Sequence, residues 1–249
     1  MPVHPDTVVD ALARALAVAP GRPFVTFYDG SSGERVELSV TTFHNWVSKI
    51  ANLFADELML DSGDGVRVVL PTCWQSTVVL LGAWTAGLRV TAVDSDVGAS
   101  VVGPDAVASG TPLAGQVIAC SLRPLGGPFT EPLPAGWLDF AFAVPSQPDA
   151  LLAPVTVQPD DVALVTATRQ LSHRALVDRG VKTAAEVGLS SGGRVLTDAN
   201  PADPEDVCAA LVAPLVSGGS VVLVTHCDEA ARSAIAEQER VTCTAWASR

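Results

Sequence analysis

The sequence predicts an α/β protein with mixed, largely parallel sheets flanked by helices. Short apolar runs bounded by turn residues alternate with longer segments of helical periodicity along most of the chain. A strand–helix–strand unit spans residues 66–93, and such a unit places its two strands parallel in one sheet. The composition is 48% hydrophobic but only 5% aromatic, which is typical of an Ala-, Val- and Leu-rich α/β core.

The charge balance argues against two classes of partner. The 249 residues include 15 basic and 27 acidic side chains, which gives a net charge of −12, and the only lysines are Lys49 and Lys182. Nucleic acids and anionic membranes both select clustered Lys and Arg, so we expect neither as a partner. The five cysteines lack CxxC spacing, which favours free thiols in a reduced compartment over a metal site.

The sequence also predicts a cytoplasmic location. Residues 1–20 lack the basic leader and long apolar core of a signal peptide. The longest apolar stretch, residues 78–93, contains Arg89 and is too short to span a bilayer.

The first elements are predicted to be a helix, a hairpin and a second helix. Apolar residues recur at helical spacing over residues 7–19. Strands at 24–28 and 35–38 flank a glycine-containing turn, which is typical of a hairpin. Thr42 is the predicted N-cap of a long helix that ends near Leu58.

The strand–helix–strand unit follows this second helix. We expect a strand at 66–70, a helix at 74–86 and a strand at 90–93. Gly87 is the predicted stop of the helix, because glycine adopts the left-handed conformation that ends helices.

Proline and glycine recur between residues 97 and 160, which indicates an irregular connection. Within it we expect only one or two short strands, such as 116–120, and an edge strand near 140–144. We predict a single domain, with a division into two lobes, 1–96 and 161–249, as the alternative.

The last part of the chain again alternates strand and helix. Ser172, Asp203 and Asp228 are the predicted N-caps of its helices, and Pro204 suits the first helical position after Asp203. We expect strands at 162–165, 193–197, 220–225 and 241–245, and helices at 172–187, 203–216 and 228–238.

Four segments carry a resemblance to a known family. They are GDGVRVVLP at 63–71, VALVT with LSHRAL at 162–176, ALVAPLVSGGSVVLV at 210–224 and EQERVTCTAW at 237–246. In this order they resemble the adenylate-forming superfamily, which includes acyl-CoA synthetases, peptide-synthetase adenylation domains and luciferases. The resemblance implies the fold of the N-terminal subdomains of these enzymes.

The resemblance breaks at the phosphate loop. The family places a loop of the type Ser/Thr-Gly-Thr-Thr-Gly-x-Pro-Lys-Gly between the VALVT-like strand and the next helix. Here the connection is Thr166-Ala167-Thr168-Arg169-Gln170, without glycine or lysine. Glycine lets a backbone approach phosphate closely and lysine offsets its charge. Thr166, Thr168, Arg169 and Ser172 are therefore at most a remnant of a cofactor-binding loop.

Other parts that the resemblance implies are also missing. The family lines its acyl pocket with an aromatic or histidine soon after the next strand, whereas residues 197–203 offer small side chains and two carboxylates. The adenine-binding segment, the ribose-binding aspartate and the lysine of a C-terminal lid domain lie downstream in the family, and this sequence ends at Arg249.

Other reactive side chains give weaker signals. His173 matches the family's Ser-His pair, and a structural role is favoured over catalysis. His226, Cys227 and Asp228 are metal-ligating types, but adjacent residues rarely point at one ion. The sequence has no Gly-x-Ser-x-Gly nucleophile elbow. Asp94 and Asp96 follow a strand, where solvated turn carboxylates are the favoured interpretation over a site.

We therefore predict a degenerate, non-catalytic relative of the adenylate-forming enzymes, with an interaction or regulatory role. Its expected partner is another protein or a second copy of the chain. No catalytic residue, metal ligand or cofactor is assigned. The alternative is a residual acyl- or nucleotide-binding ligase that uses ATP or AMP, alone or completed by a partner chain.

Overall fold

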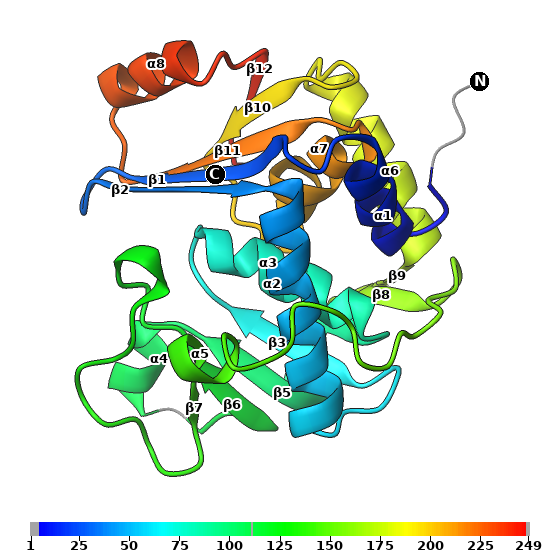
Figure 1. Ribbon diagram of the computed structural model, residues 1–249, viewed down its shortest axis with the longest axis vertical. Coiled ribbons are helices and arrows are strands. Elements are labelled where there is room, and N and C mark those ends of the chain that lie inside the picture. Colours follow the sequence, from blue (N-terminus) through cyan, green and yellow to red (C-terminus); the bar gives the residue numbers. More distant parts are fainter. Residues whose placement is uncertain (1–4, 111, 248–249) are drawn as a thin grey trace.

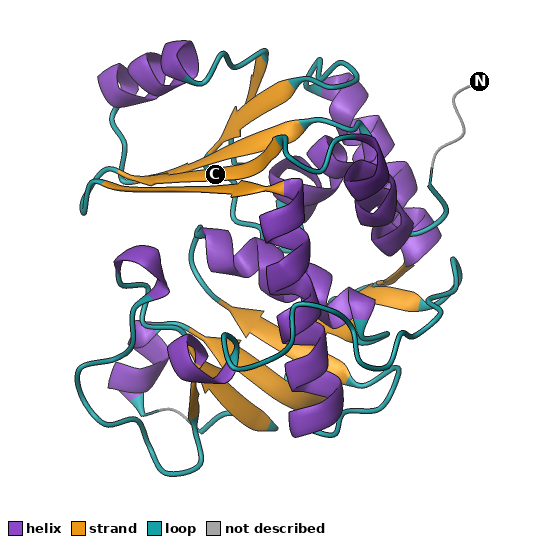
Figure 2. Ribbon diagram, in the orientation of Figure 1, coloured by secondary structure: helices purple, strands orange, loops and turns teal. Residues whose placement is uncertain are grey.

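The computed structural model describes residues 5–110 and 112–247, which form two sheets with helices packed between them (Figure 1). Figure 2 shows the layers: one sheet above, one below, and most of the helices in the space that separates them. The predicted fold class, mixed and largely parallel sheets flanked by helices, is confirmed. Within the described ranges, none of the helices is both long enough and apolar enough to cross a membrane.

The first sheet has five strands in the order β12-β10-β11-β1-β2. The pairs β1–β11, β10–β11 and β10–β12 are parallel, and only the hairpin β1–β2 is antiparallel. The strands are β1 (Pro23–Asp29), β2 (Glu34–Ser39), β10 (Arg194–Thr197), β11 (Ser220–Thr225) and β12 (Cys243–Ala245).

The second sheet has seven strands in the order β7-β6-β5-β3-β4-β8-β9. All its pairs are parallel except the hairpin β8–β9. The strands are β3 (Gly65–Val69), β4 (Arg89–Thr91), β5 (Val97–Val102), β6 (Gln116–Ala119), β7 (Leu138–Asp139), β8 (Val162–Val165) and β9 (Gln170–Ser172). Each sheet as a whole takes strands from both sides of residue 96, and the division into one or two folding units stays a prediction.

The helix α3 (Trp74–Thr85) forms the centre of the core. All its residues are buried, which explains an apolar sequence without a polar face. It packs against α2 (Val40–Asn52), where a Cβ on Gly82 would lie 2.4 Å from Cγ2 of Ile50. The absence of a side chain at Gly82 therefore permits the two helices to approach closely.

The remaining helices lie between the sheets or cover an outer face. The helices α1 (Val8–Val18) and α6 (His173–Glu186) lie on the inner side of the first sheet (Figure 1). The outer face of that sheet is covered by α8 (Glu229–Gln238), whose Ile235 packs with residues of β10 and β11. The short helix α4 (Pro104–Ser109) contributes apolar side chains to a cluster on β5 and β6.

The predicted cap of α2 is wrong by three residues. The helix begins at Val40, and the hydroxyl of Ser39 accepts a hydrogen bond from the amide of Thr42. Both residues suit an N-cap, but Ser39 ends β2 in an extended conformation and so stands directly at the strand-to-helix junction. The helix continues as the π-helical segment η1 (Leu53–Glu57), close to the predicted end.

The segment between residues 97 and 160 is more regular than predicted. Val97–Val102 is the strand β5, between β3 and β6 in the sheet, where no strand was predicted, and the strand expected at 116–120 is β6 (Gln116–Ala119). The predicted edge strand near Phe140 is wrong, because Phe140–Ala143 forms the helix α5. The carboxylate of Asp139 accepts from the amide of Ala141 and caps this helix.

The helix predicted for residues 203–216 is only partly correct. Turns precede the π-helical segment η3 (Cys208–Val212), which runs into α7 (Ala213–Val216). Proline at 214 has no amide to donate and its ring clashes with the preceding turn, so a regular α-helix cannot continue through this position. The predicted caps Ser172 and Asp228 are confirmed.

Candidate functional site

The connection between β8 and β9 is a closed hairpin turn. The amide of Thr166 donates to the carbonyl of Arg169 at 2.9 Å. The hydroxyl of Thr166 accepts from the amides of Arg169 at 3.1 Å and Thr168 at 3.4 Å. These amides are the groups that a phosphate-binding loop would present to an anion, and here they point at a side chain of the turn itself.

The one cation of the turn is also engaged. The guanidinium of Arg169 donates to the carboxylate of Glu205, which lies beyond β10 and is 36 residues away in sequence. Arg179 of α6 lies 3.7 Å from the same carboxylate. These ion pairs direct Arg169 towards the protein surface rather than towards a free anion.

Ser172 and Thr168 complete the set of predicted cofactor-binding residues. The hydroxyl of Ser172 accepts from the amide of Ala175 at 3.2 Å, and the amide of His173 donates to the carbonyl of Asp161. The helix N-terminus is therefore satisfied by its own cap. Thr168 is exposed at the tip of the turn. Thr166, Thr168 and Arg169 share the turn, while Ser172 belongs to the helix start.

The loop after β10, at residues 198–203, is held by contacts with three other parts of the chain. The carboxylate of Asp198 pairs with Arg232 of α8 at 3.1 Å and accepts from the amide of Ala247 at 2.9 Å. The side-chain amide of Asn200 donates to the carbonyl of Leu70 at the end of β3. The side chains of Asp198 and Asn200 are thus directed into the protein.

The structure adds one pair of residues that the sequence did not indicate. The guanidinium of Arg232 lies 4.7 Å from the ring centroid of Trp246, and Trp246 remains 46% exposed. This cation–π pair covers the Asp198 ion pair. The residues come from three separate segments, so no local pattern could have brought them together.

Comparisons with known proteins identify the family. No protein-family model matches the chain. A protein of Mycobacterium tuberculosis (strain ATCC 25618 / H37Rv) described as a TIGR03089 family protein is 34% identical over 241 residues, which cover 94% of this chain and 95% of that one. The chain belongs to the TIGR03089 family.

Solved structures show that this TIGR03089 member has the fold of adenylate-forming ligases. It is similar to an acyl-CoA synthetase of Brucella canis, with a TM-score of 0.81 at 21% identity, over 96% of this chain and 47% of that one. An anthranilate CoA ligase in complex with anthranoyl-AMP gives a TM-score of 0.74 at 15% identity, over 99% of this chain and 50% of that one. A fatty acyl CoA synthetase of Mycobacterium tuberculosis gives a TM-score of 0.70 at 14% identity, over 95% of this chain and 48% of that one.

These matches confirm the resemblance inferred from the sequence motifs. The chain spans about half the length of the solved ligases it matches, which agrees with a likeness to part of the adenylate-forming fold. The names of those ligases describe their own activities, and at these identities the likeness establishes only the fold of this TIGR03089 member.

His173 occupies a buried position and His226 an exposed one. His173 is 1% exposed and its ring lies edge-on to Trp84 at 6.3 Å between centroids. Burial lowers the pKa of His173 to about 4. His226 lies 2.9 Å from the carboxylate of Asp29. Within the part of the chain that the structure describes, no group of three or more His, Cys, Asp or Glu side chains could hold a metal ion.

The carboxylates of Asp94 and Asp96 lie close to arginine side chains, and the cysteines form no disulfide. Asp94 pairs with Arg67, and Asp96 lies 4.0 Å from Arg89. All five cysteines are free thiols. The pKa of the Cys73 thiol is raised to about 11 by burial, which makes it a poor nucleophile.

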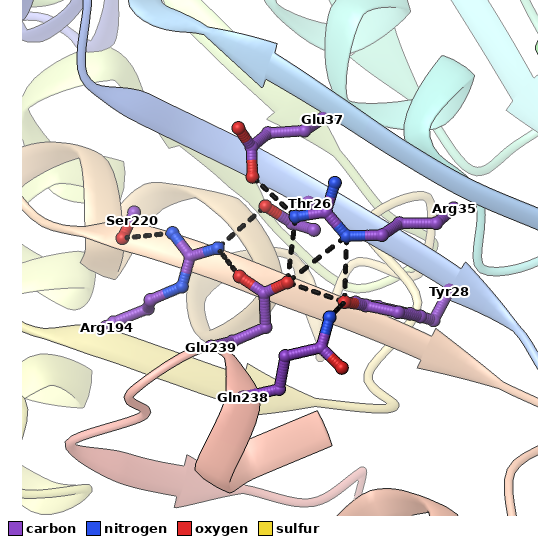
Figure 3. Close-up of polar contacts among 8 residues, drawn as sticks. All are labelled: Thr26, Tyr28, Arg35, Glu37, Arg194, Ser220, Gln238 and Glu239. Atoms are coloured by element: carbon purple, nitrogen blue, oxygen red, sulfur yellow. Dashed lines mark hydrogen bonds and ion pairs between the residues drawn. The ribbon is translucent and has the colours of Figure 1, made fainter. Parts of the chain in front are cut away.

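A second polar cluster lies on the outer face of the first sheet (Figure 3). The carboxylate of Glu239, at the end of α8, accepts from Tyr28 at 2.5 Å, from Arg35 at 2.8 Å and from Arg194 at 2.5 Å. Arg194 also donates to the hydroxyl of Thr26. These contacts join β1, β2 and β10 to α8, so the cluster fastens the outer helix to the sheet.

Proposed function

We propose that this TIGR03089 member does not adenylate carboxylates and acts as a binding or regulatory protein. The observation that carries the proposal is the closed turn between β8 and β9. The amides of Thr168 and Arg169 are directed at the Thr166 hydroxyl, and the Arg169 guanidinium is paired with Glu205.

The energetic argument follows from what phosphate requires. A triphosphate needs several backbone amides aimed outward and a cation that is free to approach it. Losing a single preorganised donor at a charged transition state costs about 3 kcal/mol. Here both amides point inward and the cation is committed to a carboxylate, so a large part of the stabilisation that catalysis needs is missing.

Calorimetry and an exchange assay test the proposal. We expect MgATP, AMP and an acyl-adenylate analogue to bind more weakly than about 1 mM, which corresponds to roughly 4 kcal/mol. We also expect no ATP–pyrophosphate exchange with pools of fatty or amino acids, under conditions in which a solved acyl-CoA synthetase is active. Submillimolar nucleotide binding or measurable exchange would contradict the proposal.

A double variant tests the geometry directly. Thr166→Val removes the hydroxyl that receives the turn amides, and Glu205→Gln removes the carboxylate that pairs with Arg169. If the closed turn is what prevents anion binding, pyrophosphate should bind this variant measurably more tightly than the wild type. Thr168→Val at the exposed tip is the matched control and should change nothing.

A binding role has its own support in the exposed apolar side chains. Leu125 is 80% exposed and Phe142 is 67% exposed, and a partner surface could cover both side chains. The expected partner is another protein or a second copy of the chain. Sedimentation velocity between about 1 and 100 μM tests self-association, and capture from the native cell tests a separate partner.

A second candidate function is a ligase completed by a partner chain. The similarity of this chain to about half of each solved ligase favours it. Nucleotide binding that develops only when a captured partner is added would support this candidate over the first. A cytoplasmic location stays a prediction for both.

A further inference from the structure

A cavity of about 570 Å³ lies between α1, α6 and α7, away from the candidate site. Its rim includes Gly192 before β10 and Gly219 before β11, so it opens at the amino ends of these strands. The turn at 166–169 and the loop at 198–203 follow the carboxyl ends of their strands. The cavity is therefore separate from the region considered for nucleotide.

The walls of the cavity are apolar and built from small side chains. Ala11 and Ala15 of α1 face Ala184 of α6 and Leu215 of α7 across the space. Alanine at these positions leaves room that larger residues would fill. The volume falls within the range of about 300–1,000 Å³ that is typical of small-molecule sites.

The charged residues of the lining all have the same sign. They are Arg14 and Arg22, and none of the described carboxylates lines the cavity in a chain whose net charge is −12. The guanidinium of Arg22 donates to the carbonyls of Gly218, at 2.9 Å, and Gly192. Among the described residues Arg22 forms no ion pair, so its charge is oriented by neutral groups but not neutralised.

We propose that this cavity binds a medium-chain carboxylate, with its tail between the helices and its head group near Arg22. An apolar space with a fixed guanidinium at its rim selects a molecule that is apolar along its length and anionic at one end. At about 30 Å³ for each methylene, similar to the share of a water molecule in the liquid, a twelve-carbon carboxylate needs roughly 400 Å³. The cavity accommodates that volume.

Titration calorimetry with dodecanoate, below its micelle concentration, tests the proposal. We expect the dissociation constant to fall roughly fourfold for each methylene added between octanoate and dodecanoate. Dodecyltrimethylammonium, which has the same tail and the opposite charge, should bind at least tenfold more weakly. Equal binding of the cation and the carboxylate, or no binding of dodecanoate at millimolar concentration, would overturn the proposal.

Two pairs of variants locate the site. Ala185→Trp places a large side chain in the mouth from an exposed position on α6 and should abolish binding. Ala17→Trp is its control, because Ala17 is equally exposed on α1 but does not line the cavity. Arg22→Met should weaken the binding of dodecanoate about tenfold, and Arg22→Lys should retain most of the wild-type affinity.

Each outcome bears on the cavity alone. If the Ala185→Trp variant binds dodecanoate as tightly as the wild type does, the ligand binds elsewhere and the proposal is wrong. This test does not depend on whether the Arg22→Met variant folds. The turn precedes the start of α6, whereas the residues of α6 that line the cavity lie near its end, at 181–185, so absence of nucleotide binding leaves this inference unaffected.

Discussion

Acid should destabilise this protein through His173, at pH values well above those at which its carboxylates are protonated. The side chain is 1% exposed, its Nδ1 has no hydrogen-bond partner, and its ring packs on Trp84. Burial lowers the pKa of His173 to about 4, while the charges of Asp161 and Asp10 raise it by less. The native state therefore keeps this imidazole neutral, whereas the unfolded chain protonates it near its ordinary value of 6.5.

The direction and the size of the change in the free energy of unfolding follow from this difference in pKa. The unfolded state binds the extra proton first, so the free energy of unfolding falls as the pH drops below about 6.5 and stops falling near 4. With these two pKa values the loss amounts to about 2 kcal/mol at pH 5 and about 3 kcal/mol at pH 4. For a domain with a total stability of roughly 5–15 kcal/mol, this is a large fraction.

Urea unfolding followed by tryptophan fluorescence at pH 7, 6, 5 and 4 measures this loss. His173→Phe keeps a ring against Trp84 but cannot be protonated, so its free energy of unfolding should stay nearly constant between pH 6.5 and 5. Burial also lowers the pKa of His44, so His44→Gln is the necessary control and should retain most of the fall. A wild type as stable at pH 5 as at pH 7, or a His173→Phe variant that loses the same free energy as the wild type, would refute the reasoning.

Two further predictions concern packing and the polar cluster on the outer face. Glu239→Gln should lower the free energy of unfolding by about 2 kcal/mol, because it leaves the guanidinium groups of Arg194 and Arg35 without their anion, while Glu237→Gln at an exposed position of α8 should change it little. Gly82→Ala should lower the free energy of unfolding by about 2 kcal/mol although alanine favours helices, because its Cβ would lie 2.4 Å from Ile50. Gly21→Ala is the control, because a Cβ there meets no atom within 4 Å. Chemical denaturation of the two glycine variants measures the difference, and equal stabilities would contradict the contact argument.

Much of the fold could be predicted from local patterns. The caps Ser172 and Asp228 precede apolar runs at helical spacing, so hydrogen bonds within four residues decide where α6 and α8 begin. A helix was predicted at 74–86, and the structure shows that every residue of α3 is buried, the polar side chains of Gln75, Ser76 and Thr77 included.

The errors occurred where two local signals competed or where the partner was distant. Ser39 and Thr42 both suit an N-cap, and the end of β2 decided between them. Aromatic residues near Phe140 favour a strand, but the cap provided by Asp139 turns the backbone into a helix. The strand β5 was missed because it is stabilised by β3 and β6, whose pairing is not visible in a local window.

The candidate site, like the fold, could be predicted only in part from the sequence. Its loss of glycine and lysine is visible in the sequence, but the fate of the remaining polar groups is not. A connection of this length makes β9 antiparallel to β8, and this geometry turns the amides of Thr168 and Arg169 inward onto Thr166. The carboxylate of Glu205 then forms an ion pair with Arg169, the one cation of the turn. Placing a single lysine or glycine in the turn would therefore not recreate an anion site, because the Thr166 hydroxyl would still hold the turn amides and Glu205 would still pair with Arg169.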